Sequence, residues 1–384
     1  MQFVGGNRLT LLRNGEAYFP SLLAAIDAAT AEVFLETYIF HDDDTGSRVT
    51  DALARAAARG VRVHLLIDGF GARDFPERFR AVLAQAGATL LVFRPRLAFI
   101  PRRNRMRRMH RKVAAIDGQI AFVGGINVTD DYEEGEDPRL HAPRYDYAVR
   151  IEGPLAHVVR ASAARLWRRV LWARRRRRTE VEPPPARPPL AGGQRAALVI
   201  RDGFRHRRDI ERAYLALLEQ SRVEVLIACA YFFPGRAFRR ALLAAAARGV
   251  RVRLVLQGKI EYPFLHYASR GLYQTLLDAG IEIYDYQVAI LHAKVAVFDR
   301  RIASVGSSNI DPLSLLLAQE ANVFAEDQEF AVELHRSIEE AIRRGAEQVR
   351  RIHWKRRPWL TRARIAVTYA LARFLISFYG FERY

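Results

Sequence analysis

The chain contains the same eighteen-residue phrase twice. Residues 110–127 read HRKVAAIDGQIAFVGGIN and residues 292–309 read HAKVAVFDRRIASVGSSN, and ten of the eighteen positions are identical without a gap. Recurring Val, Ala and Ile are expected in two copies of one buried strand. Recurring His, Lys, Asp and Asn are not, because a hydrophobic core has little use for them. The repeat therefore predicts two similar halves that each contribute polar groups to a site.

Each copy begins with the alternation that is typical of a strand. His110 and Lys112 are two residues apart and share one face, as do His292 and Lys294. Two residues along a strand span roughly 7 Å, so an imidazole and an ammonium can reach one phosphate group from the same side. A solitary His-x-Lys is more often a solvated strand edge. Two copies with the same downstream residues indicate a phosphate site instead.

A tight turn and a second apolar run follow in each copy. Asp117 with Gly118 is a hairpin signal, and Asp299 holds the same place in the second copy. The run then ends in Gly-x-x-Asn, which places Asn127 and Asn309 at the same distance from their histidines. The asparagines are expected as neutral donors beside the phosphate.

Two histidines, two lysines and two asparagines suit phosphodiester transfer through a covalent intermediate. One neutral imidazole attacks phosphorus, while the other, protonated, gives its proton to the leaving alkoxide and then takes one from the incoming alcohol. Histidine suits both roles because its pKa of about 6.5 is near the working pH. The lysines and asparagines surround the phosphoryl oxygens, where negative charge is held in the transition state. Such a site supplies its own cations, so we expect no metal and no cofactor.

The paired H-x-K-x4-D-x6-G-x2-N resembles the double motif of the phospholipase D superfamily. Within it, the chain is most similar to bacterial cardiolipin synthases, especially the short form without N-terminal membrane spans. The similarity runs from about Asn7 to about residue 350 and includes ETYIF (36–40), RRMHRK (107–112), DYAVRIEGP (146–154) and SSNIDPLSL (307–315). The resemblance implies two α/β halves, each a sheet flanked by helices, with one active site between them. It also implies a phosphohistidine intermediate and no metal.

The resemblance also implies roles for single residues. The motif residues that it assigns to catalysis are His110, Lys112, Asp117, His292, Lys294 and Asp299. Asn127 and Asn309 are expected to hold the phosphate. An acidic residue downstream of each motif orients a histidine, and Asp146 and Glu320 fit that role. Asp117 and Asp299 end their strands, so they are expected to brace the site rather than to contact substrate. Which histidine attacks phosphorus stays open.

The repeat extends beyond the motif and defines the organisation of the chain. The octapeptide AAARGVRV occurs at 56–63 and again at 245–252, each time between apolar runs. Each half reads strand, helix, strand, helix, strand and then the motif hairpin, which predicts an α/β fold with a largely parallel sheet. The octapeptide is expected to be a helix end, a glycine cap and the next strand. We predict an N-terminal half at 1–173, an Arg/Pro-rich linker at 174–191, a C-terminal half at 192–350 and a tail at 351–384.

The charge of the chain favours a polyanionic partner. The net charge is +19, from 61 basic and 42 acidic residues, and arginines cluster at 102–111, 174–178 and 355–364. A basic residue near an anionic bilayer contributes about 1 kcal/mol, so such clusters can hold an enzyme at its surface. The segment 365–381, IAVTYALARFLISFYGF, is expected to lie in a membrane interface; a helix packed on the core or on a second copy is the alternative. A single cysteine and no leader sequence favour a peripheral protein on the cytoplasmic side of the bacterial cell membrane.

These observations favour a cardiolipin synthase, in which one phosphatidylglycerol donates its phosphatidyl group to another, giving cardiolipin and glycerol. The first alternative is a phospholipase D-type phosphodiesterase or nuclease, although no aromatic residues are interleaved with the basic clusters and no nucleic acid partner is expected. A non-catalytic binding module and hydrolysis of lipid by water are further alternatives. The second substrate and the oligomeric state stay open. Glu36, inside an apolar run, needs a buried partner and is expected to support the site from below.

Overall fold

The computed structural model describes residues 1–94, 107–132, 142–174, 188–203, 205–355 and 358–378. The elements of the first half are β1 (Val4–Arg13), α1 (Asn14–Asp27), β2 (Glu32–Thr37), α2 (Asp44–Ala58), β3 (Arg62–Asp68), α3 (Glu77–Gln85), β4 (Thr89–Phe93), β5 (Lys112–Ile116), β6 (Ile120–Gly124), β7 (Tyr147–Glu152) and α4 (Pro154–Ala173). The motif hairpin is β5 and β6.

The second half repeats this order. Its elements are β8 (Gln194–Arg201), α5 (Asp209–Gln220), β9 (Glu224–Cys229), α6 (Arg236–Ala247), β10 (Arg251–Gln257), α7 (Pro263–Arg270), α8 (Tyr273–Asp278), β11 (Glu282–Tyr286), β12 (Lys294–Phe298), β13 (Ile302–Gly306), α9 (Pro312–Leu316), β14 (Glu320–Glu326), α10 (Gln328–Gly345) and β15 (Ala346–Gln348). The tail adds α11 (Arg351–Lys355) and α12 (Trp359–Phe378).

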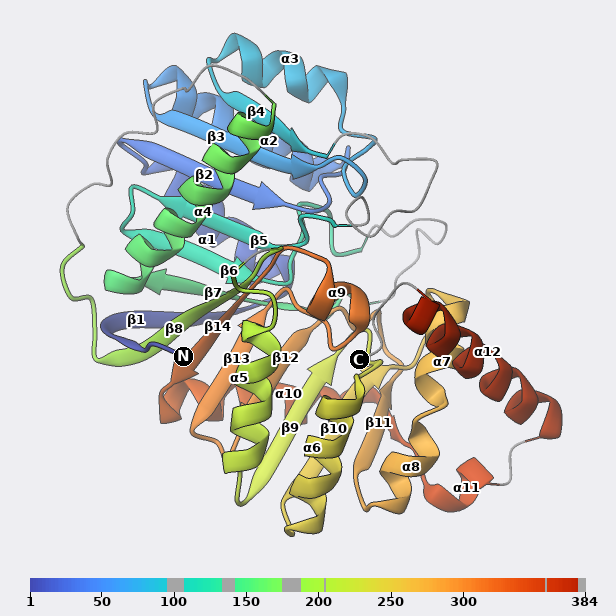
Figure 1. The fold of residues 1–384 in the computed structure, drawn as a ribbon. Coiled ribbons are helices and arrows are strands. Elements are labelled where there is room, and N and C mark those ends of the chain that lie inside the picture. The colour runs from blue at the N-terminus through green and yellow to red at the C-terminus, as the bar shows by residue number, and fades with distance from the viewer. Residues whose placement is uncertain (95–106, 133–141, 175–187, 204, 356–357, 379–384) are drawn as a thin grey trace.

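All described strands join one sheet in the order β15-β11-β10-β9-β12-β13-β14-β8-β1-β7-β6-β5-β2-β3-β4, with β1 and β8 pairing antiparallel where the halves meet (Figure 1). The prediction of an α/β fold with two similar halves is confirmed. The prediction of a largely parallel sheet is wrong: only β2-β3-β4 and β9-β10-β11 pair in parallel. A tight hairpin joins antiparallel strands only, so the two strands of each motif hairpin run antiparallel. The strands on either side of each hairpin also pair antiparallel with it.

One of the buried apolar clusters, the shared core, spans the two halves. In β5, Val113 and Ala115 face this shared core, whereas Ala114 and Ile116 face the layer of α1, α2 and α3. The shared core also holds the buried sides of α4 and α10, and β13 and β14 pack against β6 and β7 across the boundary. Burial on both faces explains why the motif strands are apolar apart from Lys112, Lys294 and Ser304.

The repeated octapeptide has the expected structure. In the first half α2 ends at Ala58, Gly60 has a φ of +88°, and β3 begins at Arg62. In the second half Gly249 has a φ of +84° between α6 and β10. Glycine adopts this left-handed conformation without strain, which ends the helix and redirects the chain into the next strand.

The tail forms α12, which packs against α7 at the edge of the second half (Figure 1). Ile365 and Ala372 face inward and are buried, whereas Val367 and Phe374 are 68% and 63% exposed. The helix therefore packs on the protein with one side and leaves an apolar side uncovered. Among the described helices, none has the length and hydropathy needed to cross a bilayer.

Candidate active site

The segments that begin the two motifs each cross to the opposite half. Met109 forms a short parallel bridge with Gln319, and Leu291 forms the same bridge with Tyr145. As a result, the His110 backbone N–H donates to the Gln319 carbonyl at 3.0 Å, and that of His292 donates to the Tyr145 carbonyl at 2.9 Å. Gln319 and Tyr145 directly precede Glu320 and Asp146, the predicted orienting acids. The backbone of each motif histidine is therefore bound next to an acid of the other half.

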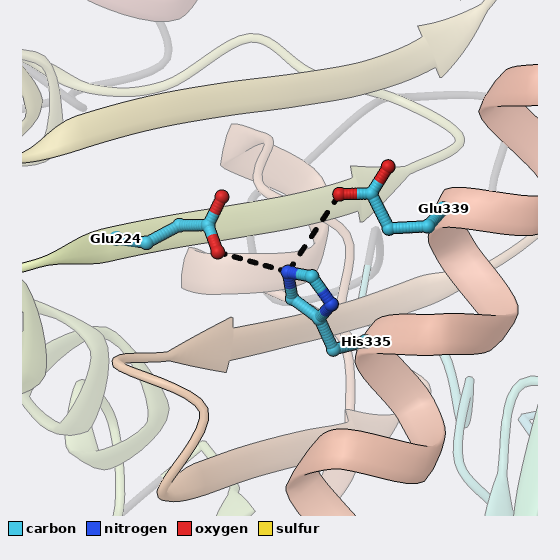
Figure 2. A group of neighbouring side chains, drawn as sticks. All are labelled: Glu224, His335 and Glu339. Carbon is cyan, nitrogen blue, oxygen red and sulfur yellow. Dashed lines mark hydrogen bonds and ion pairs between the residues drawn. The ribbon is translucent and has the colours of Figure 1, made fainter.

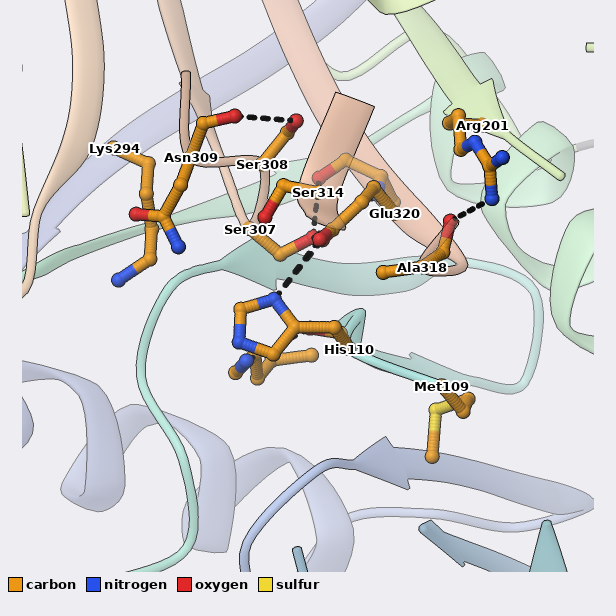
Figure 3. A network of polar contacts seen from close by, with 12 residues as sticks. Met109, His110, Arg201, Lys294, Ser307, Ser308, Asn309, Ser314, Ala318 and Glu320 are labelled. Atoms are coloured by element: carbon orange, nitrogen blue, oxygen red, sulfur yellow. Dashed lines mark hydrogen bonds and ion pairs between the residues drawn. The ribbon is translucent and has the colours of Figure 1, made fainter. Parts of the chain in front are cut away.

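The acid–histidine pairs are crossed between the halves. His110 Nδ1 lies 3.0 Å from Glu320 Oε1, and His292 Nδ1 lies 2.7 Å from Asp146 Oδ2. Both acids are buried, and Figure 3 shows the His110 ring pointing up at Glu320, which comes from β14 of the other half. With Nδ1 bound to a carboxylate, each neutral imidazole presents Nε2 as its free lone pair. The two predicted acids therefore do contact the histidines. Asp146 follows the first motif but binds the histidine of the second, and Glu320 follows the second motif but binds the histidine of the first.

Burial changes the proton affinity of both rings. Desolvation lowers the pKa of His110, although the charge of Glu320 opposes the change. The pKa of His292 falls well below its ordinary value because burial acts together with the charges of Lys294, Arg144, Lys112 and His110. That the charge of His110 acts on His292 is consistent with one shared site. Burial also raises the pKa of Asp146 to about 6.

The two lysines are placed alike. The Nζ of Lys112 donates to the His110 carbonyl at 2.7 Å, and that of Lys294 donates to the His292 carbonyl. Each ammonium has three donors and so keeps donors for a ligand. Burial and the charge of Lys294 lower the pKa of Lys112 to about 7. Two buried cations that repel one another are stabilised by an anion between them, which a phosphate supplies.

The two motif asparagines are both buried. Asn127 accepts the Ile39 backbone N–H at 3.2 Å, and its buried Nδ2 has no hydrogen-bond partner among the described residues. Asn309 is buried, and its Oδ1 lacks a partner within the same described set. An unpaired buried amide costs about 1–3 kcal/mol, so these groups are consistent with a ligand site.

Asp117 and Asp299 lie elsewhere, in the turns of the motif hairpins. Seven residues of extended chain separate each from its histidine, roughly 20 Å. The Asp117 carboxylate accepts the backbone N–H groups of Thr30, Ala31 and Glu32, and Asp299 accepts those of Arg222, Val223 and Glu224. Their inclusion among the catalytic residues is not supported by this placement. They bind the backbone at the starts of β2 and β9 and so support the sheet away from the histidines.

Sequence reasoning missed Ser307 and Tyr38. Ser307 Oγ donates to Glu320 at 2.5 Å and so helps to aim that acid at His110 (Figure 3). The Tyr38 ring packs edge-on against His110 with a centroid distance of 5.0 Å. The one available signal was the change from Gly125 to Ser307 inside an otherwise repeated phrase.

Glu36 has the buried partner that it needs. Its carboxylate lies 2.5 Å from Arg111 Nε, next to the motif histidine, and burial raises its pKa. Glu36 of β2 therefore holds Arg111, which lies between His110 and the start of β5. The arginines at 102, 103 and 105 and those at 175–178 fall outside the described residues.

One group of acids and a histidine within the described residues has the spacing of metal ligands: Glu224 of β9 with His335 and Glu339 of α10 (Figure 2). The guanidinium of Arg253 occupies its centre. Arg253 Nη2 lies 2.6 Å from Glu224 Oε1 and 3.2 Å from His335 Nε2, and it also pairs with Glu339. Because a cation already joins these groups, the cluster is an ion-pair network that fastens α10 to the sheet.

Comparison with known proteins decides the family. The family model "Cardiolipin synthase, PLD-like domain" matches residues 22–155 and 214–342. The chain is 41% identical over 365 residues to cardiolipin synthase B of Escherichia coli K12, which covers 92% of this chain and 85% of that protein. The chain belongs to the cardiolipin synthase family.

More distant relatives agree with this membership. The chain is 32% identical over 355 residues to cardiolipin synthase A of Pseudomonas fluorescens, covering 90% of this chain and 71% of that protein. The crystal structure of phosphatidylserine synthase from Haemophilus influenzae has the same fold, with a TM-score of 0.69 over 98% of this chain and 94% of that chain, at 15% identity. The resemblance read from the paired motif is confirmed.

Proposed function

We propose that this member of the cardiolipin synthase family transfers a phosphatidyl group from one phosphatidylglycerol to another, forming cardiolipin and glycerol. The observation that carries the proposal is the crossed arrangement of His110 with Glu320 and His292 with Asp146. Each half supplies the histidine for one pair and the acid for the other, so neither half is complete alone.

In the first step the Nε2 of one neutral histidine attacks phosphorus. The P–O bond to glycerol breaks, and the partner histidine, protonated, gives its proton to the leaving oxygen. The carboxylate on each Nδ1 fixes the tautomer and stabilises whichever ring carries positive charge. Lys112, Lys294, Asn127 and Asn309 hold the phosphoryl oxygens through the transition state.

In the second step the partner histidine acts as the base. It takes the proton of a second phosphatidylglycerol hydroxyl, whose oxygen attacks the phosphohistidine, and the P–N bond breaks to restore the first ring. One phosphodiester is formed for each one broken, so the reaction needs no nucleotide. The four cationic or neutral donors on the phosphate make a metal unnecessary.

Product identification tests this proposal. Purified protein is incubated with vesicles that contain labelled phosphatidylglycerol, and the lipids are separated. We expect labelled cardiolipin and an equal amount of free glycerol. Formation of phosphatidic acid alone would contradict the transferase and favour hydrolysis of lipid.

We also propose that the exposed side of α12 binds an anionic phospholipid surface, peripherally and on the cytoplasmic side. Trp359, Val367 and Phe374 are more than half exposed, and the exposed Arg362 and Arg364 lie on the same helix. An apolar side flanked by arginines suits an interface of acyl chains and anionic headgroups. The neighbouring α7 adds Phe264, which is 40% exposed.

Sedimentation with vesicles tests this surface. We expect the protein to pellet with phosphatidylglycerol vesicles and less with phosphatidylcholine vesicles. Replacement of both Val367 and Phe374 by Asp should abolish the pelleting without unfolding, because both side chains are exposed. Unchanged pelleting of this variant would contradict the assignment to α12.

A further inference from the structure

The two halves use corresponding residues to support the start of each motif. Asp68 ends β3, and its Oδ2 accepts the Met109 backbone N–H at 2.8 Å. Gln257 ends β10, and its Oε1 accepts the Leu291 backbone N–H at 2.9 Å. Met109 and Leu291 each precede a motif histidine. Asp68 and Gln257 therefore hold equivalent backbone positions in the two halves.

The other polar atom of each side chain, Oδ1 of Asp68 and Nε2 of Gln257, is bound differently in the two halves. The second oxygen of Asp68 accepts the backbone N–H groups of Phe70 at 2.8 Å and Gly71 at 3.2 Å. The Nε2 of Gln257 has no hydrogen-bond partner among the residues that the structure describes, although the side chain is only 8% exposed. A buried amide donor left unpaired is costly, which points to a ligand as its partner.

Gln257 lines a small pocket between the ends of β9 and β10 and the helix α7. Glu261 and Asp311 supply carboxylates to its wall, and Tyr231 donates its hydroxyl to Glu261 at 2.7 Å. The aromatic ring of Tyr262 packs against Tyr231 with a centroid distance of 5.8 Å. The pocket thus combines hydrogen-bond donors, acceptors and ring surface, as a site for a small polar group does.

The pocket adjoins the catalytic groups. The charge of Glu261 acts on Lys294, and Ala230 of the pocket wall donates its N–H to the Ala293 carbonyl at 2.9 Å, between the motif histidine and lysine. Tyr262 also acts electrostatically on Tyr38 of the other half, whose ring contacts His110. The pocket therefore lies next to the segment of the second half that carries His292 and Lys294.

We propose that this pocket is the alcohol subsite of the enzyme and that it holds the glycerol headgroup. This inference rests on the proposed phosphatidyl transfer. The leaving glycerol of the donor and the incoming glycerol headgroup of the acceptor have the same chemistry and occupy it in turn. Gln257 Nε2 donates to one glycerol hydroxyl oxygen, and Glu261 accepts from a glycerol hydroxyl.

The donor and acceptor pattern selects glycerol. A hydroxyl both donates and accepts, so it satisfies an amide N–H and a carboxylate together. An ethanolamine headgroup would pair its ammonium with Glu261, but an ammonium has no acceptor and would leave the Gln257 amide unpaired. A site that hydrogen-bonds a substrate hydroxyl discriminates strongly against an alcohol that lacks it.

Competition between two alcohols tests the subsite. The full-length protein acts on phosphatidylglycerol vesicles with labelled glycerol and propan-1-ol together in the buffer, and the ratio of labelled phosphatidylglycerol to phosphatidylpropanol is measured. Gln257→Glu keeps an oxygen for the Leu291 N–H and removes the donors. We expect its glycerol-to-propanol ratio to fall at least tenfold. The matched control Gln119→Glu, in the exposed turn of the first motif hairpin, should keep the ratio.

The ratio distinguishes binding of glycerol by Gln257 from the support that Gln257 gives to the backbone at Leu291. Equal losses with both alcohols, or an unchanged ratio, would overturn the subsite, since a supporting role does not distinguish acceptors. If Gln257→Glu yields no folded protein, Glu261→Gln must lower the ratio instead. Use of ethanolamine as readily as glycerol by the unmodified protein would also overturn it. Absence of transfer to any alcohol would instead defeat the proposed function itself.

Discussion

In the first half Asp146 lies beside Gly125, whereas in the second half Glu320 lies beside Ser307, although both acids bind a motif histidine through Nδ1. A Cβ atom at Gly125 would overlap the Asp146 carboxylate. Glu320 has one more methylene group than Asp146, and its carboxylate also accepts a hydrogen bond from Ser307. The difference teaches that the duplicated site preserves the position of the carboxylate oxygen and lets the surrounding residues vary together.

A second pair of networks differs in the same manner. At the start of β2, Glu32 pairs with Arg160 of α4, and the nearby His64 has its pKa lowered to about 4 by burial. At the start of β9, Glu224 pairs with His335 of α10 and with Arg253 of β10. In the first half the histidine is on the strand and the arginine on the helix, whereas in the second half the arginine is on the strand and the histidine on the helix. Both networks fasten a helix to the sheet, so their common role is structural.

The largest effect should come from the histidines that both halves share. His110→Ala and His292→Ala should each lower the rate of cardiolipin formation by roughly 10³-fold or more, because each step needs both a nucleophile and a proton carrier. The circular dichroism spectrum should stay unchanged. Half of the activity surviving in either variant would mean that the halves work as separate sites.

The next effect should be unequal between the halves. Gly125→Ser forces a side chain into the space of the Asp146 carboxylate and displaces it from His292, so we expect a loss of activity of about a hundredfold or more. Ser307→Gly removes one hydrogen bond to Glu320 and leaves the His110 contact, so the loss should be about tenfold or less. Equal losses in steady-state assays would contradict the account of the two acids.

Asp117→Ala and Asp299→Ala should affect stability more than chemistry. Each removes an acceptor for three backbone N–H groups, at a cost of about 2 kcal/mol, and should lower the Tm by a few degrees. Thermal unfolding and kcat are measured on the same samples below the transition. A large fall in kcat without a change in Tm would restore these residues to the catalytic group.

The smallest effect is expected from chelation. Excess chelator should leave both activity and Tm unchanged, because Arg253 fills the one described cluster with ligand-like spacing. A divalent cation that raises the Tm, with the rise lost in Glu339→Gln, would show that this network binds metal.

Much of the architecture follows from the sequence because the repeat is carried by strongly apolar runs and by a glycine at each helix end. The sequence could not reveal that the acids are crossed. Asp146 and Glu320 follow their own motifs along the chain, and only the bridges of Met109 with Gln319 and of Tyr145 with Leu291 carry each acid to the other motif. Such long-range pairing leaves no local pattern.

The sequence predicted that Asp117 braces the site, but it did not reveal the hydrogen-bond partners of Asp117 or the role of Gln257. The spacing of Asp117 places it in a hairpin turn but does not say which backbone amides it accepts, and those belong to a strand start more than eighty residues away. Gln257 lies in no repeated phrase. Its importance depends on one unpaired atom in a pocket, which a sequence does not display.

The central claim is that two halves build one site on one phosphorus atom. Rapid quenching of the protein with ³²P-labelled phosphatidylglycerol, followed by digestion and mass spectrometry, counts the phosphatidyl groups bound to histidine in each chain. One site predicts at most one group per chain, always on the same histidine. Two groups on one chain, carried by His110 and His292 together, would contradict it.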